Sequence, residues 1–403
     1  YSIQGIRLVY DINPNWRIKA FSGNQKGNKN SDTRFGYTPQ VLSGINLDGT
    51  LGVGKDSKFG TLNVGASAVN RNIDRNTMQE LVAILETYAR KDQFAPKYNV
   101  YAFNGYFNYN VGNFNIGGEA NFKTPEAIVD IDNKLILKGG KVLYGSIGWG
   151  DRYSLGTRTL ANGKKKKNTL SLGVNLQVRH VDHFPFRTSP RESLLNGLIS
   201  YLPSLTKQNS YRLMARYNAP AQDLGENGIQ GEFTANINKG TRIIFNTSYV
   251  QSLAHNGVMD PNTREMVSQK LFQEYNGQIV QNIGKDKLKV GLQRVFYNQA
   301  VYEQEPEYEN VETYTPYMEW LHKIGSDKSL RIEAQYLKTD KDQGSFANLM
   351  IEYYFNKEWS MSVGDMINSE PHRYERMNIV NDVLHYPMVF VSYNKNNSFY
   401  TLS

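Results

Sequence analysis

Two histidines and an aspartate stand close together in the segment "HVDH", where His180, Asp182 and His183 carry atoms that could bind a metal ion. His180 and Asp182 share one face if the segment is a strand, because side chains two residues apart point the same way. A zinc site needs at least three protein ligands, and the sequence identifies no third one. We therefore interpret these residues as polar groups at a strand end and predict no metal site.

An acidic segment, "EQEPEYENVE", is the second candidate for metal binding. Loops rich in carboxylate oxygens can bind Ca²⁺, but the spacing here differs from that of a known calcium-binding loop. Pro306 and the dense charge favour an exposed loop instead. The glutamates concerned are Glu303, Glu305, Glu307, Glu309 and Glu312.

Signs of catalysis are few. The chain has no cysteine, which excludes thiol chemistry, disulfides and cysteine metal sites. It has no Gly-x-Ser-x-Gly elbow, phosphate-binding loop, His-Glu-x-x-His motif or dinucleotide fingerprint. The glycine-rich "GENGIQG" from Gly225 is interpreted as a turn. We expect a non-enzymatic protein without a cofactor.

Four consecutive lysines, Lys164, Lys165, Lys166 and Lys167, are the candidate partner-binding residues. They precede an alternating segment directly, which predicts a solvated hairpin tip. Contact with anionic lipid or with an acidic partner is the next interpretation, and it fits a net charge of +8. A nucleic-acid site would combine basic residues with aromatic stacking groups, and no aromatic residue lies nearby. We expect no nucleic-acid partner.

Apolar and polar residues alternate along most of the chain, which is the pattern of strands with one apolar face. "YAFNGYFNYNVGNFNIGGEANF" reads as a complete hairpin with a turn at Val111-Gly112-Asn113. Further tips are predicted at "INPN", "NINKG", "IGKDK", "IGSDK" and "YFNKE", where glycine, asparagine and aspartate favour tight turns. Longer loops are predicted over 22–40, 155–168, 218–228, 254–266 and 298–314, with an irregular stretch over 183–207.

One segment has helical spacing. Met78, Leu81 and Leu85 recur at intervals of three and four residues, and Asn76 is a suitable N-cap with Gln79 three residues later. The sequence predicts an amphipathic helix over about 77–91. We favour an insert packed on the sheet over a membrane-surface or partner-binding helix.

Two architectures produce this alternation. In a water-soluble sandwich or filled barrel the apolar residues point inward, and in an outer-membrane barrel they point to lipid. Faces of about 9 to 11 residues, polar opposite faces, and Trp and Tyr near strand ends favour the membrane barrel. We predict an all-β fold: a large antiparallel up-and-down β-barrel of about 16 to 20 strands, of outer-membrane type, with one short amphipathic helix insert. Residues 1–403 form a single domain, expected to be a fragment of a longer chain.

Several segments resemble a family. "SYLPSLTKQNSYRLMARYNAP" (200–220), "NGIQGEFTANI", "LRIEAQYLKTDKDQGSFANLMIEYYFNKEWSMSVGD" (330–365), "GIRLVYDINPNWRIKAFSG" and "RHVDHFPFRTSPR" are similar to a Bacteroidota family of exported, barrel-like proteins of unknown function. One type within that family is similar to the plug of the type IX secretion translocon, which closes the periplasmic end of a giant outer-membrane barrel.

The resemblance implies a non-enzymatic protein on the periplasmic side of the outer membrane. Its expected partners are the translocon barrel with its associated subunits, and outer-membrane lipid or lipopolysaccharide as a further contact. The alternative function is an outer-membrane transport barrel, similar to a porin, for a solute such as a glycan.

Overall fold

The computed structural model describes residues 3–26, 37–52, 59–159, 165–192, 197–200, 202–261, 263–370, 383–395 and 398–402. Eighteen strands form one antiparallel sheet, and each strand pairs with the next along the chain from β1 to β20. The small ribbon β11–β12 stands apart from it. Among the described residues no ladder joins β1 to β20. The predicted all-β, up-and-down architecture of about 16 to 20 strands is confirmed.

The strands of the sheet, called the wall below, are β1 (Ile3–Asn13), β2 (Trp16–Lys26), β3 (Tyr37–Leu51), β4 (Thr61–Asn72), β5 (Asn99–Val111), β6 (Phe114–Val129), β7 (Leu135–Thr159), β8 (Lys165–Asp182), β9 (Gly225–Ile237), β10 (Thr241–Ser252), β13 (Lys270–Ile283), β14 (Asp286–Tyr297), β15 (Val311–Ile324), β16 (Lys328–Leu337), β17 (Ser345–Tyr354), β18 (Trp359–Glu370), β19 (Leu384–Lys395) and β20 (Ser398–Leu402). The ribbon is β11 (Val258–Met259) and β12 (Met266–Val267), and the helical elements are α1 (Arg75–Glu86), η1 (Arg90–Asp92), η2 (Ala254–Asn256) and α2 (Gln299–Tyr302).

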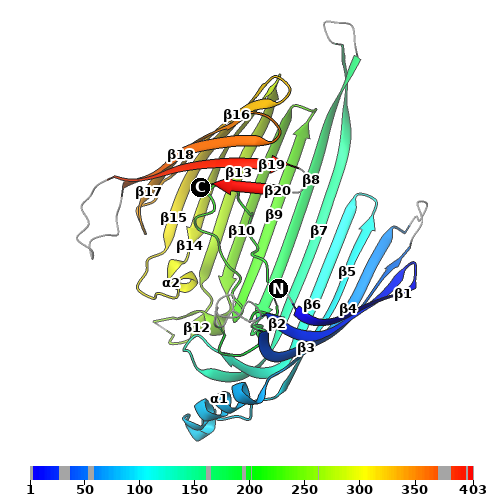
Figure 1. Ribbon diagram of the computed structural model, residues 1–403, viewed down its shortest axis with the longest axis vertical. Coiled ribbons are helices and arrows are strands. Elements are labelled where there is room, and N and C mark those ends of the chain that lie inside the picture. The colour runs from blue at the N-terminus through cyan, green and yellow to red at the C-terminus, as the bar shows by residue number, and fades with distance from the viewer. Residues whose placement is uncertain are drawn as a thin grey trace.

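The two ends of the wall differ. The predicted tight turns fall at one end, here the short-turn end, and Gly112, Gly284 and Gly325 have positive φ there, as such turns require. The opposite, long-loop end carries α1, α2 and the ribbon, at the bottom of Figure 1. It also carries the connection from β8 to β9, residues 183–224. Consecutive hairpins therefore place these connections at the same end of the wall.

Helix α1 begins earlier than predicted. Asp74, and not Asn76, is the N-cap, because the Asp74 carboxylate accepts the backbone N–H groups of Asn76 and Thr77. The helix ends at Glu86, short of the predicted residue 91. Leu81 and Leu85 are buried in a cluster with strand-end residues of β6 and β7, so the interpretation as a packed insert is confirmed.

One face of the wall is apolar and exposed. Tyr101, Phe103 and Phe107 on β5 are 43–49 % exposed. Phe103 lies opposite Ala68 on β4 and Phe122 on β6, so the apolar row continues across strands. All four tryptophans share this outer face by register and lie near the short-turn end. They are Trp16, Trp149, Trp320 and Trp359.

The inner face is polar. Cross-strand register aligns one row that contains serine, asparagine, arginine, lysine and glutamate with a single valine. The row runs Ser171, Asn236, Arg242, Val280, Lys289, Glu319 and Glu333. Strand periodicity thus gives the wall two chemically opposite surfaces.

Two segments that were predicted to be irregular lie partly or wholly in strands. β7 reaches Thr159 and β8 starts at Lys165, so residues 157–159 and 165–167 of the loop predicted over 155–168 pair with each other. The glycine-rich turn predicted from Gly225 lies in β9, because Gly225 to Gly231 pair with β8 on one side. Pro387 lies within β19 and pairs with β18 on one side. On its other side β20 pairs only with residues from Val391 onward, so Pro387 has no described strand partner there. Proline is tolerated at such an edge.

Candidate functional site

The connection 183–224, called the insert below, lies against the inner face of the wall. Its contacts reach Gln25 of β2, whose side chain donates to the Leu198 carbonyl at 2.9 Å, and Met388 of β19, which Arg212 contacts. Strands near both edges of the sheet therefore meet the same segment. The insert lies on the inner side of the curved wall, called the lumen below, toward the long-loop end (Figure 1).

The first part of the insert is held by a buried charged group. Arg71 and Glu126 form an ion pair at 2.7 Å, and Lys123 lies 2.6 Å from the same carboxylate, with all three side chains at most 3 % exposed. Arg71 also donates to the Arg187 carbonyl at 2.7 Å, and Lys123 donates to the Pro185 carbonyl. Backbone oxygens of the insert thus satisfy cations that the wall would otherwise bury without enough partners.

A second buried pair holds the middle and the end of the insert. Arg179 of β8 pairs with Glu226 of β9, and both side chains are at most 5 % exposed. Arg179 donates also to the Pro203 carbonyl, while Glu226 accepts the Gln222 backbone N–H at 2.9 Å. The pair therefore links the two ends of the 203–222 segment to adjacent strands.

Apolar packing holds the last part. Leu213 and Tyr217 are buried in the largest hydrophobic cluster, with residues from β10 and β13 to β18. The backbone N–H of Leu213 donates to the Gln335 side chain at 2.9 Å, and Arg216 lies 4.5 Å from the centre of the Phe346 ring. Wall glycines allow the close approach: a Cβ at Gly228 would lie 2.8 Å from Leu205. Buried apolar contacts therefore hold this part of the insert against the wall.

Tyr211 joins the insert to a charged group on the wall. Its hydroxyl donates to Glu319 at 2.9 Å and accepts from Lys289, which lies 3.4 Å from the same glutamate. Burial and the adjacent Glu319 raise the pKa of Tyr211 far above its ordinary value, so the phenol is neutral. Arg331 completes the group at 2.9 Å from Glu319.

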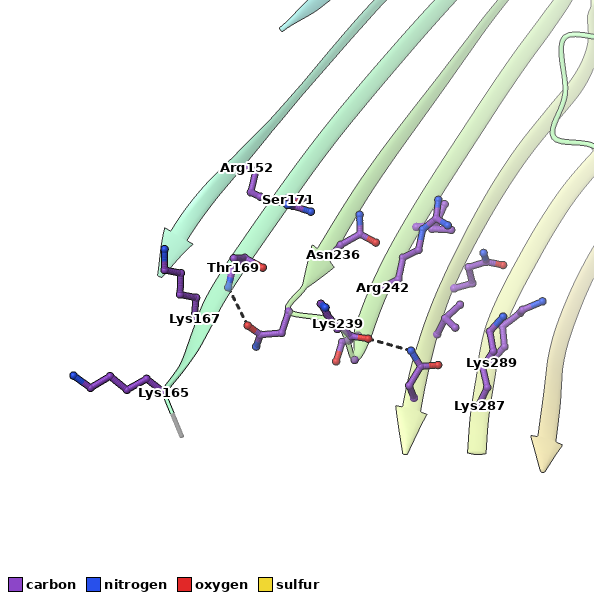
Figure 2. Close-up of a pocket in the computed structure, with 17 residues that line it drawn as sticks. Arg152, Lys165, Lys167, Thr169, Ser171, Asn236, Lys239, Arg242, Lys287 and Lys289 are labelled. Atoms are coloured by element: carbon purple, nitrogen blue, oxygen red, sulfur yellow. Dashed lines mark hydrogen bonds between the residues drawn. The ribbon is translucent and has the colours of Figure 1, made fainter. Parts of the chain in front are cut away.

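Beyond Tyr211, toward the short-turn end, the inner wall lines an open cavity of about 1090 Å³. Basic side chains enter it from β7, β8, β10, β14 and the turn between β9 and β10 (Figure 2). Its lining includes seven cations and no carboxylate among the described residues. The cations are Arg152, Lys165, Lys167, Lys239, Arg242, Lys287 and Lys289.

The lysine run contributes to this cavity in part. Lys165 and Lys167 are exposed and line it, and they lie in β8 opposite Thr159 and Thr157, not in a turn. Lys164 and the side chain of Lys166 fall outside the described residues. Sequence patterns place these lysines near a strand end, but the other five cations are far away along the chain. Only the strand register brings them together.

The "HVDH" segment gains a third ligand that the sequence did not reveal. His255 stacks on His183 with ring centres 4.2 Å apart, and Asp182 lies 2.6 Å from His183 and 3.7 Å from His255. These three are the group within the described residues that could hold a metal ion. His180 instead bonds Asn227 at 2.8 Å. The acidic segment is exposed, with Glu309 paired to Lys341, and forms no such group in the described part of the chain.

Family comparison identifies the chain. A model for a family of unknown function (DUF6029) matches residues 1–403. The chain belongs to this family. No curated protein matches it. Within the described residues no helix is long and apolar enough to cross a membrane.

Similar solved structures include the FrpB iron transporter from Neisseria meningitidis (10 % identity, TM-score 0.34, covering 97 % of this chain and 72 % of that chain). The copper transporter OprC gives 8 % identity, TM-score 0.41 and coverage of 97 % and 64 %. A mutant of the ferric enterobactin receptor PfeA from Pseudomonas aeruginosa has 8 % identity and a TM-score of 0.35, and the match covers 97 % of this chain and 70 % of that chain. These likenesses are weak, and the fold described above is defined by this chain's own strand register.

Arg179→Met should loosen the insert. The change leaves Glu226 buried without its cation, at a cost of about 3–5 kcal/mol. We expect faster hydrogen exchange over the described residues 202–224. The double variant Arg179→Met/Glu226→Leu should recover part of the loss, because it removes both charges. If the double variant is as loose as the single one, the pair does not hold the insert.

The insert should also be held more firmly at acidic pH. Burial raises the pKa of Asp223 to about 6, against the opposing effect of Arg187. A carboxyl group with a raised pKa in the folded state binds its proton more tightly there, so stability grows as pH falls from about 6 toward 4. Hydrogen exchange at 202–224, corrected for intrinsic rates, should slow over this range. Asp223→Asn should reduce the pH dependence, and an unchanged profile would contradict the assignment.

Proposed function

We propose that this chain is a non-enzymatic outer-membrane protein with a closed lumen, and that it plugs the periplasmic end of the type IX secretion translocon. The observation that carries the proposal is the insert, which is bonded to the inner wall from β2 to β19. A body that blocks the passage of proteins must not conduct through its own lumen. An insert held by buried ion pairs and apolar packing meets that requirement.

The outer face supports the membrane location. Large apolar side chains stay exposed across neighbouring strands, as with Ile279 on β13, which lies opposite Val290 on β14. Exposed apolar patches of this extent are rare on soluble monomers. Tryptophans near the short-turn end match an interfacial girdle, and in outer-membrane barrels the short turns face the periplasm. The basic cavity and Lys165 and Lys167 then lie at the periplasmic end.

Ile279→Arg should therefore destabilise the protein in lipid bilayers by about 2–4 kcal/mol, because a charge near the bilayer midplane is poorly solvated. Ile283→Arg is the matched control: it lies on the same face of β13 but at the strand's last residue, where the cost is about 0–1 kcal/mol. Denaturant unfolding in vesicles measures both. Equal effects of the two changes would argue against a membrane-spanning outer face.

The translocon role predicts a native complex. Gentle detergent extraction followed by native mass spectrometry should find this chain bound to a giant outer-membrane barrel. Lys165→Glu/Lys167→Glu should weaken that association through charge reversal at the periplasmic end. Lys328→Glu/Lys357→Glu changes the net charge equally at hairpin tips outside the cavity, and should have little effect. Persistent absence of the giant barrel from the extracted complex would refute the plug role.

One observation favours the alternative, a transport barrel for a solute such as a glycan. The lumen keeps a polar cavity of about 1090 Å³, a size that accommodates a small solute. A transport barrel needs a route past the insert. A steady ionic current through the intact chain in a planar bilayer would therefore support transport and oppose the closed plug.

A further inference from the structure

We infer that the basic cavity is a binding site for an acidic saccharide, a sugar that carries carboxylate or phosphate groups. The inference goes beyond the plug role and stands whether or not the chain binds a translocon. It rests on the charge of the lining, on the neutral polar groups between the cations, and on the hydrogen bonds that fix the turn between β9 and β10.

Most of the positive charge of the cavity has no carboxylate partner among the described residues. Lys289 alone among its seven cations faces a described carboxylate, that of Glu319 at 3.4 Å. Arg152 donates to the Ser171 hydroxyl at 3.2 Å. The remaining five have no ion pair with the described carboxylates. They are Lys165, Lys167, Lys239, Arg242 and Lys287.

These five side chains are exposed, so a ligand can reach them. Like charges gathered in a concave surface with protein walls create a strong positive potential, which concentrates anions. Mutual repulsion of the cations costs free energy in the empty cavity, and a bound anion relieves it. The ligand should therefore carry more than one negative group.

Neutral hydrogen-bonding side chains stand between the cations. Thr169, Ser171, Asn236, Gln278 and Asn282 line the same cavity and suit the hydroxyl groups of a sugar. Within the described part of the lining, the apolar side chains are those of Ile244 and Val280. No aromatic ring is present among the described lining residues. A neutral sugar or a nucleic-acid base would lack a stacking surface, so the acidic groups must supply the affinity.

Fixed geometry favours a defined site. Asn282 donates to the Lys239 carbonyl at 3.1 Å, and Asn238 accepts the Thr169 backbone N–H at 3.0 Å (Figure 2). These bonds fix the turn between β9 and β10 against both neighbouring hairpins. The basic side chains thus extend from a braced rim, which reduces the ordering cost of binding.

The experiment measures binding by calorimetry with the intact chain in a zwitterionic detergent. Trigalacturonate is the carboxylated probe, glucose 1,6-bisphosphate the phosphorylated one, and maltotriose the neutral control of similar length. Binding of either acidic probe, with none for maltotriose and a loss at high salt, is expected. The acidic probe that binds shows whether the natural source carries carboxylates or phosphates. Failure of both acidic probes to bind overturns the inference.

Two double variants locate the site. Lys239→Gln/Lys287→Gln removes two cavity cations and should weaken binding roughly tenfold or more, because each charged hydrogen bond contributes strongly. Lys328→Gln/Lys357→Gln removes the same charge outside the cavity and should leave binding unchanged. Equal weakening by both pairs means attraction to net charge alone and overturns the inference. Equally tight binding of the oligonucleotide dT6, abolished by the cavity variant, would also overturn it in favour of nucleic acid.

Discussion

The insert and the charged inner wall depend on each other. Arg71, Lys123 and Glu126 are buried, and burying three charges is costly unless each has partners. The wall supplies the ion pairs among them, and Arg71 and Lys123 each donate one further hydrogen bond to a backbone carbonyl of the insert, at residues 187 and 185. Arg179 and Glu226 repeat this arrangement at residues 203 and 222. The insert therefore supplies hydrogen-bond partners to buried wall residues as well as occupying the lumen.

Strand alternation explains why such an interior can exist beside an apolar exterior. Each strand contributes every second residue to each face, so a chain of modest hydropathy still builds a continuous apolar outer surface. The same period leaves the inner face free to carry ionisable groups. Toward the long-loop end such groups are hydrogen-bonded, as with Glu274, which accepts from Gln293 at 2.8 Å and from the Lys207 backbone at 3.3 Å. Around the basic cavity, toward the short-turn end, five cations have no ion pair with a described carboxylate.

Much of the wall could be predicted from sequence because hairpins are local. The turn at Gly112 and Asn113 follows from a glycine flanked by alternating residues, and the structure has it there. The predictions were wrong where the local sequence favours a turn but a neighbouring strand pairs with it. The charge of Lys165 and Lys167 predicted a hairpin turn, but the last residues of β7 pair with both lysines. At α1 the Asp74 carboxylate caps the helix in place of Asn76.

The site itself could not be predicted, since its parts are distant in sequence. His255 joins Asp182 and His183 only because η2 follows β10 at the same end of the wall. Arg71 reaches residue 187 across 116 positions. The irregular composition of 183–207 did indicate a break from the strand pattern. Nothing in that composition shows that the break turns inward, because the carbonyls that bond the wall belong to the backbone and not to particular side chains.

The first half of the insert is held to the wall by hydrogen bonds to cations and the second half by apolar packing, so the two halves differ in how easily they can be released. Carbonyls at 185 and 187 face charged groups, and water can replace them as partners for Arg71 and Lys123. Leu213 and Tyr217 pack among buried apolar residues of seven strands, and water cannot replace those contacts. Any opening of the lumen should therefore begin at the first half, beside β4 and β6, while the second half stays anchored near β16. The basic cavity, which adjoins the anchored half through Tyr211 and Lys289, would keep its wall throughout.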